Sequence, residues 1–325
     1  MTSFFTSIID SVNTSLTSYI KSTSLETIRI KEKTYQCTKL LGEGGFAQVF
    51  LALDENQQQY AIKKIRCKLG NEQVKRAKQE IKVHGLFQHK YIVPILDTTI
   101  LKDSDGYKVV YIIMPFYKRG TLQDNIEYYY TSGKHFTERQ IYKLFKDICY
   151  ALNVLHLYNS SEQFKDGKEE KEDRNIKPWA HRDIKPGNIM ISDSGKPLLM
   201  DFGSTLPANL TINNNKEAMQ HQDIVNEHSS MPYRSPELMD VKVGTTINEK
   251  VDVWSLGCSI FTMAYGESPF EKFVNSHGGG SLSLAILNGQ FKFPDSPTYS
   301  TNLKDLISWM MTMEINERPS VTQVI

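Results

Sequence analysis

The sequence predicts an α+β fold with two lobes, a small lobe built on an antiparallel sheet with one main helix and a larger, mainly helical lobe. Residues 28–114 consist of short alternating segments typical of strands, with one helical stretch at residues 72–87. After a connection at residues 115–120 that contains Pro and Gly, helical periodicity dominates residues 121–325. A chain of 325 residues is long enough to bury a core in each lobe.

The composition excludes several classes of protein. The chain has 38 Lys and Arg against 37 Asp and Glu, a net charge of +1, so nothing favours nucleic-acid binding. The four cysteines have no C-x-x-C spacing, which favours reduced thiols in a cytoplasmic protein over a disulfide framework or a zinc site. No run of 18 apolar residues occurs, so we expect no membrane span.

Two segments stand apart from the packed pattern. Residues 1–26 form a Ser- and Thr-rich leader whose apolar residues recur at helical spacing. Two interpretations stay open: a disordered or packed leader, or an amphipathic helix that makes a peripheral contact with an internal membrane. Thr2 excludes N-myristoylation, which needs a glycine there. Residues 159–177 are charged with mixed sign and predict a solvated insertion.

A glycine motif at residues 42–49, GEGGFAQV, lies between two strand-like segments. Gly42, Gly44 and Gly45 allow a tight turn to approach phosphate groups and to direct backbone N–H groups toward them. Because a strand and not a helix follows, the motif disfavours a dinucleotide-binding fold. Taken alone, it favours an ordinary glycine hairpin over a phosphate site.

Lys63 follows on a strand-like segment, where its ammonium can reach phosphate oxygens. Alternation along the strand directs the neighbouring Lys64 to the opposite face. A single Lys on a strand is usually a solvated charge, so the assignment depends on a carboxylate that orients it. Glu80, on the helical stretch 72–87, is the expected partner, and Glu72 is the competing one.

The strongest chemical signal is HRDIKPGN at residues 181–188, followed by Asp201-Phe202-Gly203. Phosphoryl transfer requires an acceptor hydroxyl held in line, Mg²⁺ ions on the phosphates, and positive charge at the moving group. Asp183 can receive the hydroxyl proton and Lys185 can face the γ-phosphate. Asn188 and Asp201 can bind Mg²⁺ through oxygen. A single Asp or Asn here is usually a turn or cap residue, but that does not account for the ordered set.

Over residues 35–325 these motifs resemble the signature set of the eukaryotic protein kinases of the serine/threonine type. Ser235-Pro236-Glu237 is similar to the motif that closes the activation segment, here residues 201–237, and Arg318 to the late Arg that pairs with Glu237. GEGGFAQVFLA, PFYKRGTL and NERP are most similar to the Numb-associated kinases, near the branch of the myristoylated and palmitoylated serine/threonine kinase. The resemblance implies the bilobal protein kinase fold, protein substrates, and ATP with Mg²⁺.

The resemblance also implies an adenine site. Its backbone donor would come from Tyr117, because Pro115 has no N–H. The side chains implied around the adenine are Leu41, Val49, Ala61, Met114 and Met190.

Specificity and regulation are implied in the same way. Lys185, with Ser230, is typical of Ser/Thr kinases. Arg182 is expected to bind either a phosphate on Thr205, Thr211 or Ser229, or one of the acidic residues of the segment. The family's segment tends to contain an extra helix. The alternatives are a dual-specificity kinase, a small-molecule phosphotransferase, and a pseudokinase scaffold, suggested by Ala47 in place of the third loop glycine.

Overall fold

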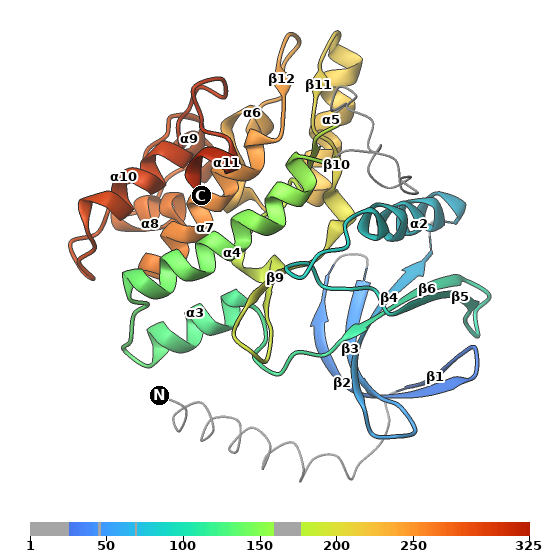
Figure 1. The fold of residues 1–325 in the computed structure, drawn as a ribbon. Helices are drawn as coiled ribbons and strands as arrows, with labels where there is room; N and C mark the ends of the chain where they lie inside the picture. Colours follow the sequence, from blue (N-terminus) through green and yellow to red (C-terminus); the bar gives the residue numbers. More distant parts are fainter. Residues whose placement is uncertain (1–25, 45–46, 69, 159–176) are drawn as a thin grey trace, which may run out of the picture. The chain divides into compact units, whose positions relative to one another are not determined.

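The computed structural model describes residues 26–44, 47–68, 70–158 and 177–325, which fall into two compact units (Figure 1). The smaller unit comprises residues up to Lys78 together with Pro94–Phe116, and the larger comprises Gln79–Val93 and Tyr117–Ile325. The smaller unit is built on an antiparallel sheet and the larger is mainly helical, so the predicted fold class is confirmed.

The sheet of the smaller unit has six strands in the order β1-β2-β3-β4-β6-β5, with every neighbouring pair antiparallel. Their bounds are β1 Glu26–Ile30, β2 Lys33–Glu43, β3 Ala47–Leu53, β4 Gln59–Cys67, β5 Asp97–Lys102 and β6 Lys108–Pro115. Side chains alternate between two faces, and one face carries the core of the unit, which includes Phe50, Ile62 and Ile113. An ion pair between Lys31 Nζ and Asp97 Oδ1, 2.7 Å long, joins the β1–β2 turn to the start of β5.

Helix α2 spans Asn71–Leu86, one residue earlier at each end than the predicted stretch. Its second half belongs to the larger unit because Val83 lies in that unit's core and Phe87 stacks on Phe202. The small lobe predicted as one stretch, 28–114, is therefore interrupted at residues 79–93. At the other end, strand β1 begins at Glu26, within the predicted leader, and residues 1–25 lie outside the described residues.

The larger unit contains most of the helices, and polar caps explain where several of them begin. Thr121 and Thr137 each form a capping box, with Asp124 and Gln140 respectively, at the starts of α3 and α4. The helix bounds are α3 Leu122–Thr131, α4 Glu138–His156, α5 Asn215–His228, α6 Pro236–Met239, α7 Lys250–Tyr265, α8 Pro269–Ser276, α9 Leu282–Leu287, α10 Thr301–Met310 and α11 Val321–Val324.

Helix α7 forms the centre of this unit. Every residue from Val251 to Tyr265 is buried, which is typical of a core helix with no solvent face. The helix ends at Gly266, whose φ of +82° favours glycine. A Cβ there would lie 2.7 Å from the ring of Tyr130, so a larger residue is excluded by space as well.

Short elements complete the larger unit. This unit also contains three two-stranded sheets, which pair β7 with β10, β8 with β9, and β11 with β12. Their bounds are β7 Trp179–Ala180, β8 Ile189–Ile191, β9 Pro197–Leu199, β10 Leu206–Pro207, β11 Leu210–Thr211 and β12 Thr246–Ile247, and the 3₁₀ turns are η2 Pro186–Asn188, η3 Phe202–Ser204 and η4 Met231–Tyr233. Helix α5 is the extra helix that the resemblance implied in the segment 201–237. Of the predicted insertion, residues 159–176 lie outside the described residues.

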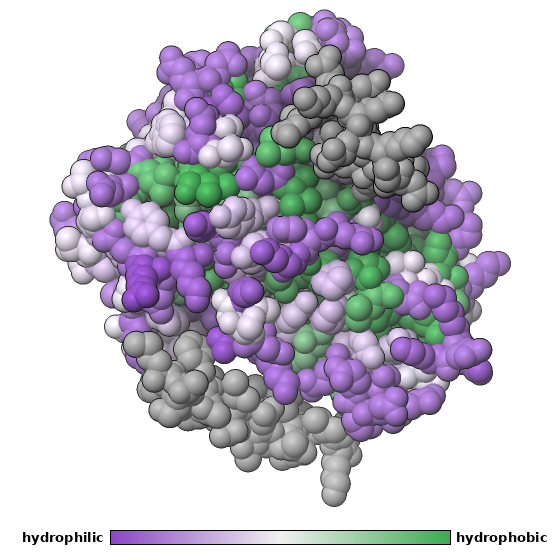
Figure 2. Space-filling model, viewed as in Figure 1, coloured by the Kyte–Doolittle hydropathy of each residue, from purple (hydrophilic) through white to green (hydrophobic). Residues whose placement is uncertain are grey.

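The face drawn in Figure 2 is mainly hydrophilic, with hydrophobic side chains exposed between the polar ones. Among the described residues, no helix combines the length and the apolar character that crossing a membrane requires.

Candidate active site

The loop at residues 181–188, called the catalytic loop below, is anchored by Asp252 on helix α7. Asp252 is fully buried. Its Oδ2 accepts hydrogen bonds from the backbone N–H of His181 at 2.7 Å and from Nε2 of His156 at 2.9 Å, and its Oδ1 accepts one from the N–H of Arg182 at 2.7 Å. Burial alone would raise the pKa of Asp252, but these hydrogen bonds and the nearby histidines lower it below its usual value. The buried carboxylate thus fixes the backbone that precedes Asp183.

Arg182 has a left-handed backbone with φ of +66°, a conformation uncommon for a residue with a side chain. Its side chain is buried, and Nη2 donates to the backbone carbonyl of Pro207 at 3.0 Å. Burial lowers the pKa of Arg182, and the charge of Asp252 opposes that shift. The predicted partner on the segment 201–237 was a phosphate or an acidic side chain. The structure instead places the carbonyl of Pro207 against Arg182.

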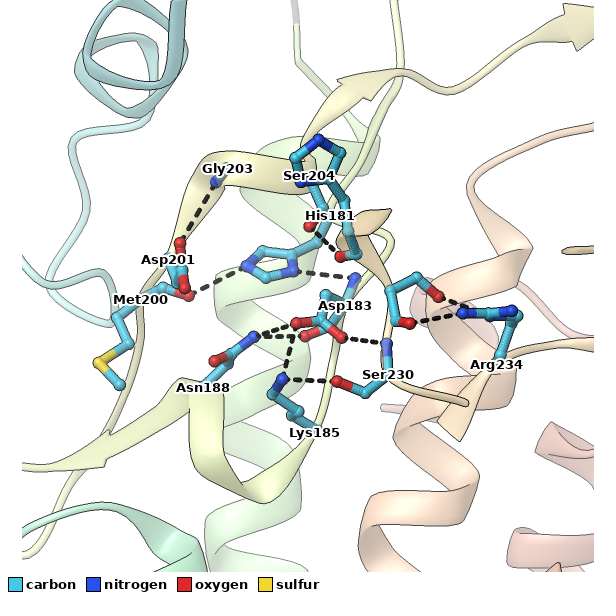
Figure 3. Close-up of polar contacts among 12 residues, drawn as sticks. His181, Asp183, Lys185, Asn188, Met200, Asp201, Gly203, Ser204, Ser230 and Arg234 are labelled. Carbon is cyan, nitrogen blue, oxygen red and sulfur yellow. Dashed lines mark hydrogen bonds and ion pairs between the residues drawn. The ribbon is translucent and has the colours of Figure 1, made fainter. Parts of the chain in front are cut away.

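The Asp183 carboxylate lies within hydrogen-bonding distance of three other residues of the predicted site, Lys185, Asn188 and Ser230 (Figure 3). Oδ2 of Asp183 accepts from Nδ2 of Asn188 at 2.8 Å and lies 2.9 Å from Nζ of Lys185. Its Oδ1 accepts from the backbone N–H of Ser230 at 2.8 Å, and Lys185 Nζ donates to Ser230 Oγ at 2.5 Å. The carboxylate is therefore held from three directions while its side chain remains 11% exposed.

Asp201 follows β9 and also has a left-handed backbone, with φ of +63°. The preceding carbonyl, of Met200, lies 3.1 Å from Nε2 of His181, which ties Asp201 to the catalytic loop. The next side chain, Phe202, is buried and stacks on His84 of α2 at a ring separation of 4.4 Å. Asp201 itself is exposed.

Glu80 lies beside the same segment. A Cβ placed on Gly203 would lie 3.6 Å from Oε2 of Glu80 and 3.4 Å from Oδ1 of Asp201, so the two carboxylates flank one glycine. The competing carboxylate, Glu72, instead pairs with Lys75 at 2.6 Å on the exposed side of α2. Of the two candidate carboxylates, Glu80 is the one near the other site residues of the larger unit.

The oxygen atoms of Asn188 and Asp201 suit a divalent metal bound with nucleotide phosphates. Nδ2 of Asn188 donates to both the backbone carbonyl and the carboxylate of Asp183, which fixes the amide so that Oδ1 points the other way. The described residues contain no cluster of three or more His, Cys, Asp or Glu able to hold a metal on its own. One carboxylate and one amide oxygen match a metal that also takes phosphate ligands, as Mg²⁺ does.

In the smaller unit, strand register places several predicted residues on one face of the sheet. Val49 is opposite Lys63 and Ala61 is opposite Met114, so these four residues share the face opposite to the core. Lys64 lies on the core side, where its Nζ is 2.5 Å from Oε2 of Glu26. The prediction that Lys63 and Lys64 point to opposite faces is confirmed.

The other predicted residues lie at the β2–β3 hairpin and in the larger unit. Leu41 lies at an irregularity of β2 and is 39% exposed, and Gly42 pairs with Val49 across the β2–β3 hairpin. The N–H of Gly44 donates to the carbonyl of Ala47 at 2.8 Å, which confirms a strand–turn–strand motif, while Gly45 lies outside the described residues. Tyr117 and Met190 belong to the larger unit, where Met190 forms a bridge with Thr121.

The pair expected at the end of the segment 201–237 is also present. Arg318 is buried and donates from Nη1 and Nη2 to the two carboxylate oxygens of Glu237 at 2.7 and 3.1 Å. This bidentate pair is the one that the sequence resemblance predicted. Sequence reasoning missed the contacts of Asp252 and those of Arg234, described below. The signal that could have found Asp252 is a charged residue inside the apolar run VDVWSLGCSIF.

The fold and the site together define a phosphotransferase domain, with a glycine hairpin and a strand Lys in one unit and an Asp–Lys–Asn loop with a second Asp in the other. The chain belongs to the protein kinase family, because residues 35–325 match the protein kinase domain. Protein kinases use ATP and a divalent metal and act on proteins.

Several curated protein kinases are similar to this chain over nine tenths of its length. Serine/threonine-protein kinase ppk13 of Schizosaccharomyces pombe is 34% identical, over 92% of this chain and 91% of its own length. Serine/threonine-protein kinase ENV7 of Saccharomyces cerevisiae is 31% identical, over 92% of each chain. Serine/threonine-protein kinase 16 of Homo sapiens is 35% identical, over 91% of this chain and 89% of its own length.

Proposed function

We propose that this chain transfers the γ-phosphate of ATP to Ser and Thr hydroxyls of proteins, with Asp183 as the base. The observation that carries the proposal is that Lys185, Asn188 and the backbone N–H of Ser230 each lie within 3 Å of the Asp183 carboxylate, with Lys185 also bonded to the Ser230 hydroxyl. The similar proteins are all named serine/threonine-protein kinases, which supports the choice of acceptor.

The chemistry needs little from the protein besides position and charge. A bond forms between the acceptor oxygen and the γ-phosphorus, the bond from that phosphorus to ADP breaks, and the hydroxyl proton passes to the Asp183 carboxylate. Asn188 and the N–H of Ser230 hold that carboxylate in one orientation. Lys185, 2.9 Å from Asp183 and hydrogen-bonded to Ser230, supplies positive charge next to the transferred group.

ATP and metal binding are assigned by residue. We propose that Asn188 and Asp201 hold Mg²⁺ through oxygen, and that Lys63, oriented by Glu80, binds ATP phosphates. Mg²⁺, when bound, would neutralise phosphate charge during transfer. The glycines proposed at the phosphates are Gly42, Gly44 and Gly45, and the residues proposed at the adenine are Leu41, Val49, Ala61, Met114, Tyr117 and Met190.

The test is transfer from labelled ATP to casein in the presence of Mg²⁺. We expect labelling by the parent chain, and a loss of several orders of magnitude in Asp183→Asn and Asp201→Asn. Asp305→Asn, an exposed aspartate on α10, is the matched control. Equal labelling of casein by the parent and Asp201→Asn would contradict the assignment of Asp201. A parent chain that labels no casein would favour the pseudokinase alternative. Analysis of the labelled residues separates Ser/Thr from dual specificity.

Two narrower proposals rest on the sequence alone. We place the chain in the Numb-associated branch on its phosphate-loop and hinge motifs, although none of the similar proteins above carries that family's name. We also propose a cytoplasmic protein with peripheral membrane contact through the amphipathic pattern of residues 1–26. Removing residues 1–25, which spares Glu26 of β1, should lower co-flotation with liposomes and leave casein labelling intact. An intact chain that binds no vesicle composition would contradict the membrane proposal.

A further inference from the structure

Arg234, between η4 and α6, is a buried cation near the catalytic loop, and only 4% of its surface is exposed. Its guanidinium donates four hydrogen bonds, all to the end of α5 and the residue that follows it. Nη1 donates to Asn226 Oδ1 at 2.9 Å, and Nη2 to the carbonyls of Val225 at 3.2 Å and Ser229 at 2.6 Å. Nε donates to Ser229 Oγ at 3.1 Å.

The acceptors of Arg234 are all uncharged, which is uncommon for a buried guanidinium. Within the described part of the chain, Arg234 forms no ion pair with a carboxylate. Burial lowers the pKa of Arg234, and the charge that opposes this shift is that of Asp183. Carbonyls at a helix C-terminus carry partial negative charge, so a cation suits this position, and the planar fork reaches several oxygens at once.

Arg234 holds Ser229, and the next residue along the chain is Ser230. Figure 3 shows Ser230 in contact with Asp183 and Lys185. Arg234 fixes both the carbonyl and the hydroxyl of Ser229. The next residue, Ser230, donates its N–H to Asp183 at 2.8 Å and accepts from Lys185 at 2.5 Å. A displacement of Ser229 would therefore displace Ser230 and disturb the two hydrogen bonds that Ser230 forms with the catalytic loop.

We infer that Arg234 is a positioning residue for phosphoryl transfer, which sets Ser230 against Asp183 and Lys185 by fixing Ser229 to the last turn of α5. This role rests on the proposed function of Asp183 and Lys185. A positioning role differs from simple stabilisation of the segment, because it predicts that the effect of Arg234 on kcat depends on Ser230.

The test measures kcat on casein, KM for ATP and the melting temperature for a graded series. Arg234→Gln should lower kcat about 100-fold, because small displacements of positioned groups cost that much, and leave KM for ATP within about twofold. Arg234→Lys, which keeps the charge but not the fork, should lose about tenfold. Arg139→Gln, at an exposed position on α4, is the control and should match the parent.

A double-mutant cycle with Ser230→Ala separates positioning from stability. In the Ser230→Ala background, the fold-loss in kcat caused by Arg234→Gln should be smaller than in the parent by a factor of about three or more. The inference is overturned if Arg234→Gln lowers kcat equally in the parent and in Ser230→Ala, or does not lower it at all. It is also overturned if the loss of kcat disappears when the assay is run well below the melting temperature. If Arg234→Gln does not fold, Arg234→Lys and Asn226→Ala are judged by the same criteria. A parent chain that labels no casein would contradict the proposed function itself, whereas an active parent with unaffected variants contradicts only the role of Arg234.

Discussion

Replacing Asp252 by Asn tests whether a buried carboxylate on α7 holds the catalytic loop in its reactive form. The change keeps the size of the side chain but removes its charge and one acceptor oxygen. In the structure both carboxylate oxygens accept backbone N–H groups, one from His181 and one from Arg182, and Oδ2 also contacts His156. The Asn amide N–H₂ would face one of these donors, so one backbone N–H would lose its partner.

The expected cost follows from these bonds. Losing one charge-assisted hydrogen bond costs about 1.5–3 kcal/mol, and leaving a donor buried without a partner adds about 1–3 kcal/mol. We therefore expect the free energy of unfolding to fall by about 3–5 kcal/mol. Arg182 holds a φ of +66° that its surroundings must impose, so the loop should relax and kcat should fall about 100-fold.

The assay combines urea unfolding with casein labelling, repeated across pH. Because folding lowers the pKa of Asp252, its stabilising contribution is fully present above the unfolded pKa of about 4 and is lost as pH falls through the lower folded value. The difference in unfolding free energy between parent and Asp252→Asn should therefore be constant near neutral pH and shrink below about pH 4.

Asp305→Asn, at an exposed position on α10, serves as the control and should leave both quantities unchanged. The reasoning is refuted if Asp252→Asn unfolds within about 0.5 kcal/mol of the parent and retains more than half of its kcat.

Two further predictions concern lysines and ion pairs. Lys63→Met should abolish casein labelling, whereas Lys64→Met should retain it. Lys64→Met should lower the free energy of unfolding by about 1 kcal/mol, because it removes the ion pair with Glu26. Equal effects of the two variants on labelling would contradict the assignment of the two faces. Arg318→Met should lower the free energy of unfolding by about 3–5 kcal/mol, since it leaves the Glu237 carboxylate largely buried and unpaired, and a change below about 1 kcal/mol in urea unfolding would show that the pair is dispensable.

Motifs and local periodicity in the sequence were enough to predict the fold class and the residue types proposed for the site. Motifs at residues 42–49, 181–188 and 201–203 identify residue types whose spacing matches phosphoryl transfer. Strand alternation was enough to separate Lys63 from Lys64, because the period of a strand is a local property of the backbone. The ends of α2 were predicted to within one residue because helical periodicity is likewise a local property of the sequence.

The residues that hold the catalytic loop from distant parts of the chain could be identified from the folded structure and not from the sequence. Asp252 meets the catalytic loop about 70 residues along the chain from it, and Arg234 reaches Ser230 through the end of α5. Residues 79–93 joined the larger unit because His84 and Phe87 pack on Phe202, a contact far apart in sequence. Local propensity and periodicity carry no information about such pairs, since burial and hydrogen-bond partners are set by which surfaces the folded chain brings together.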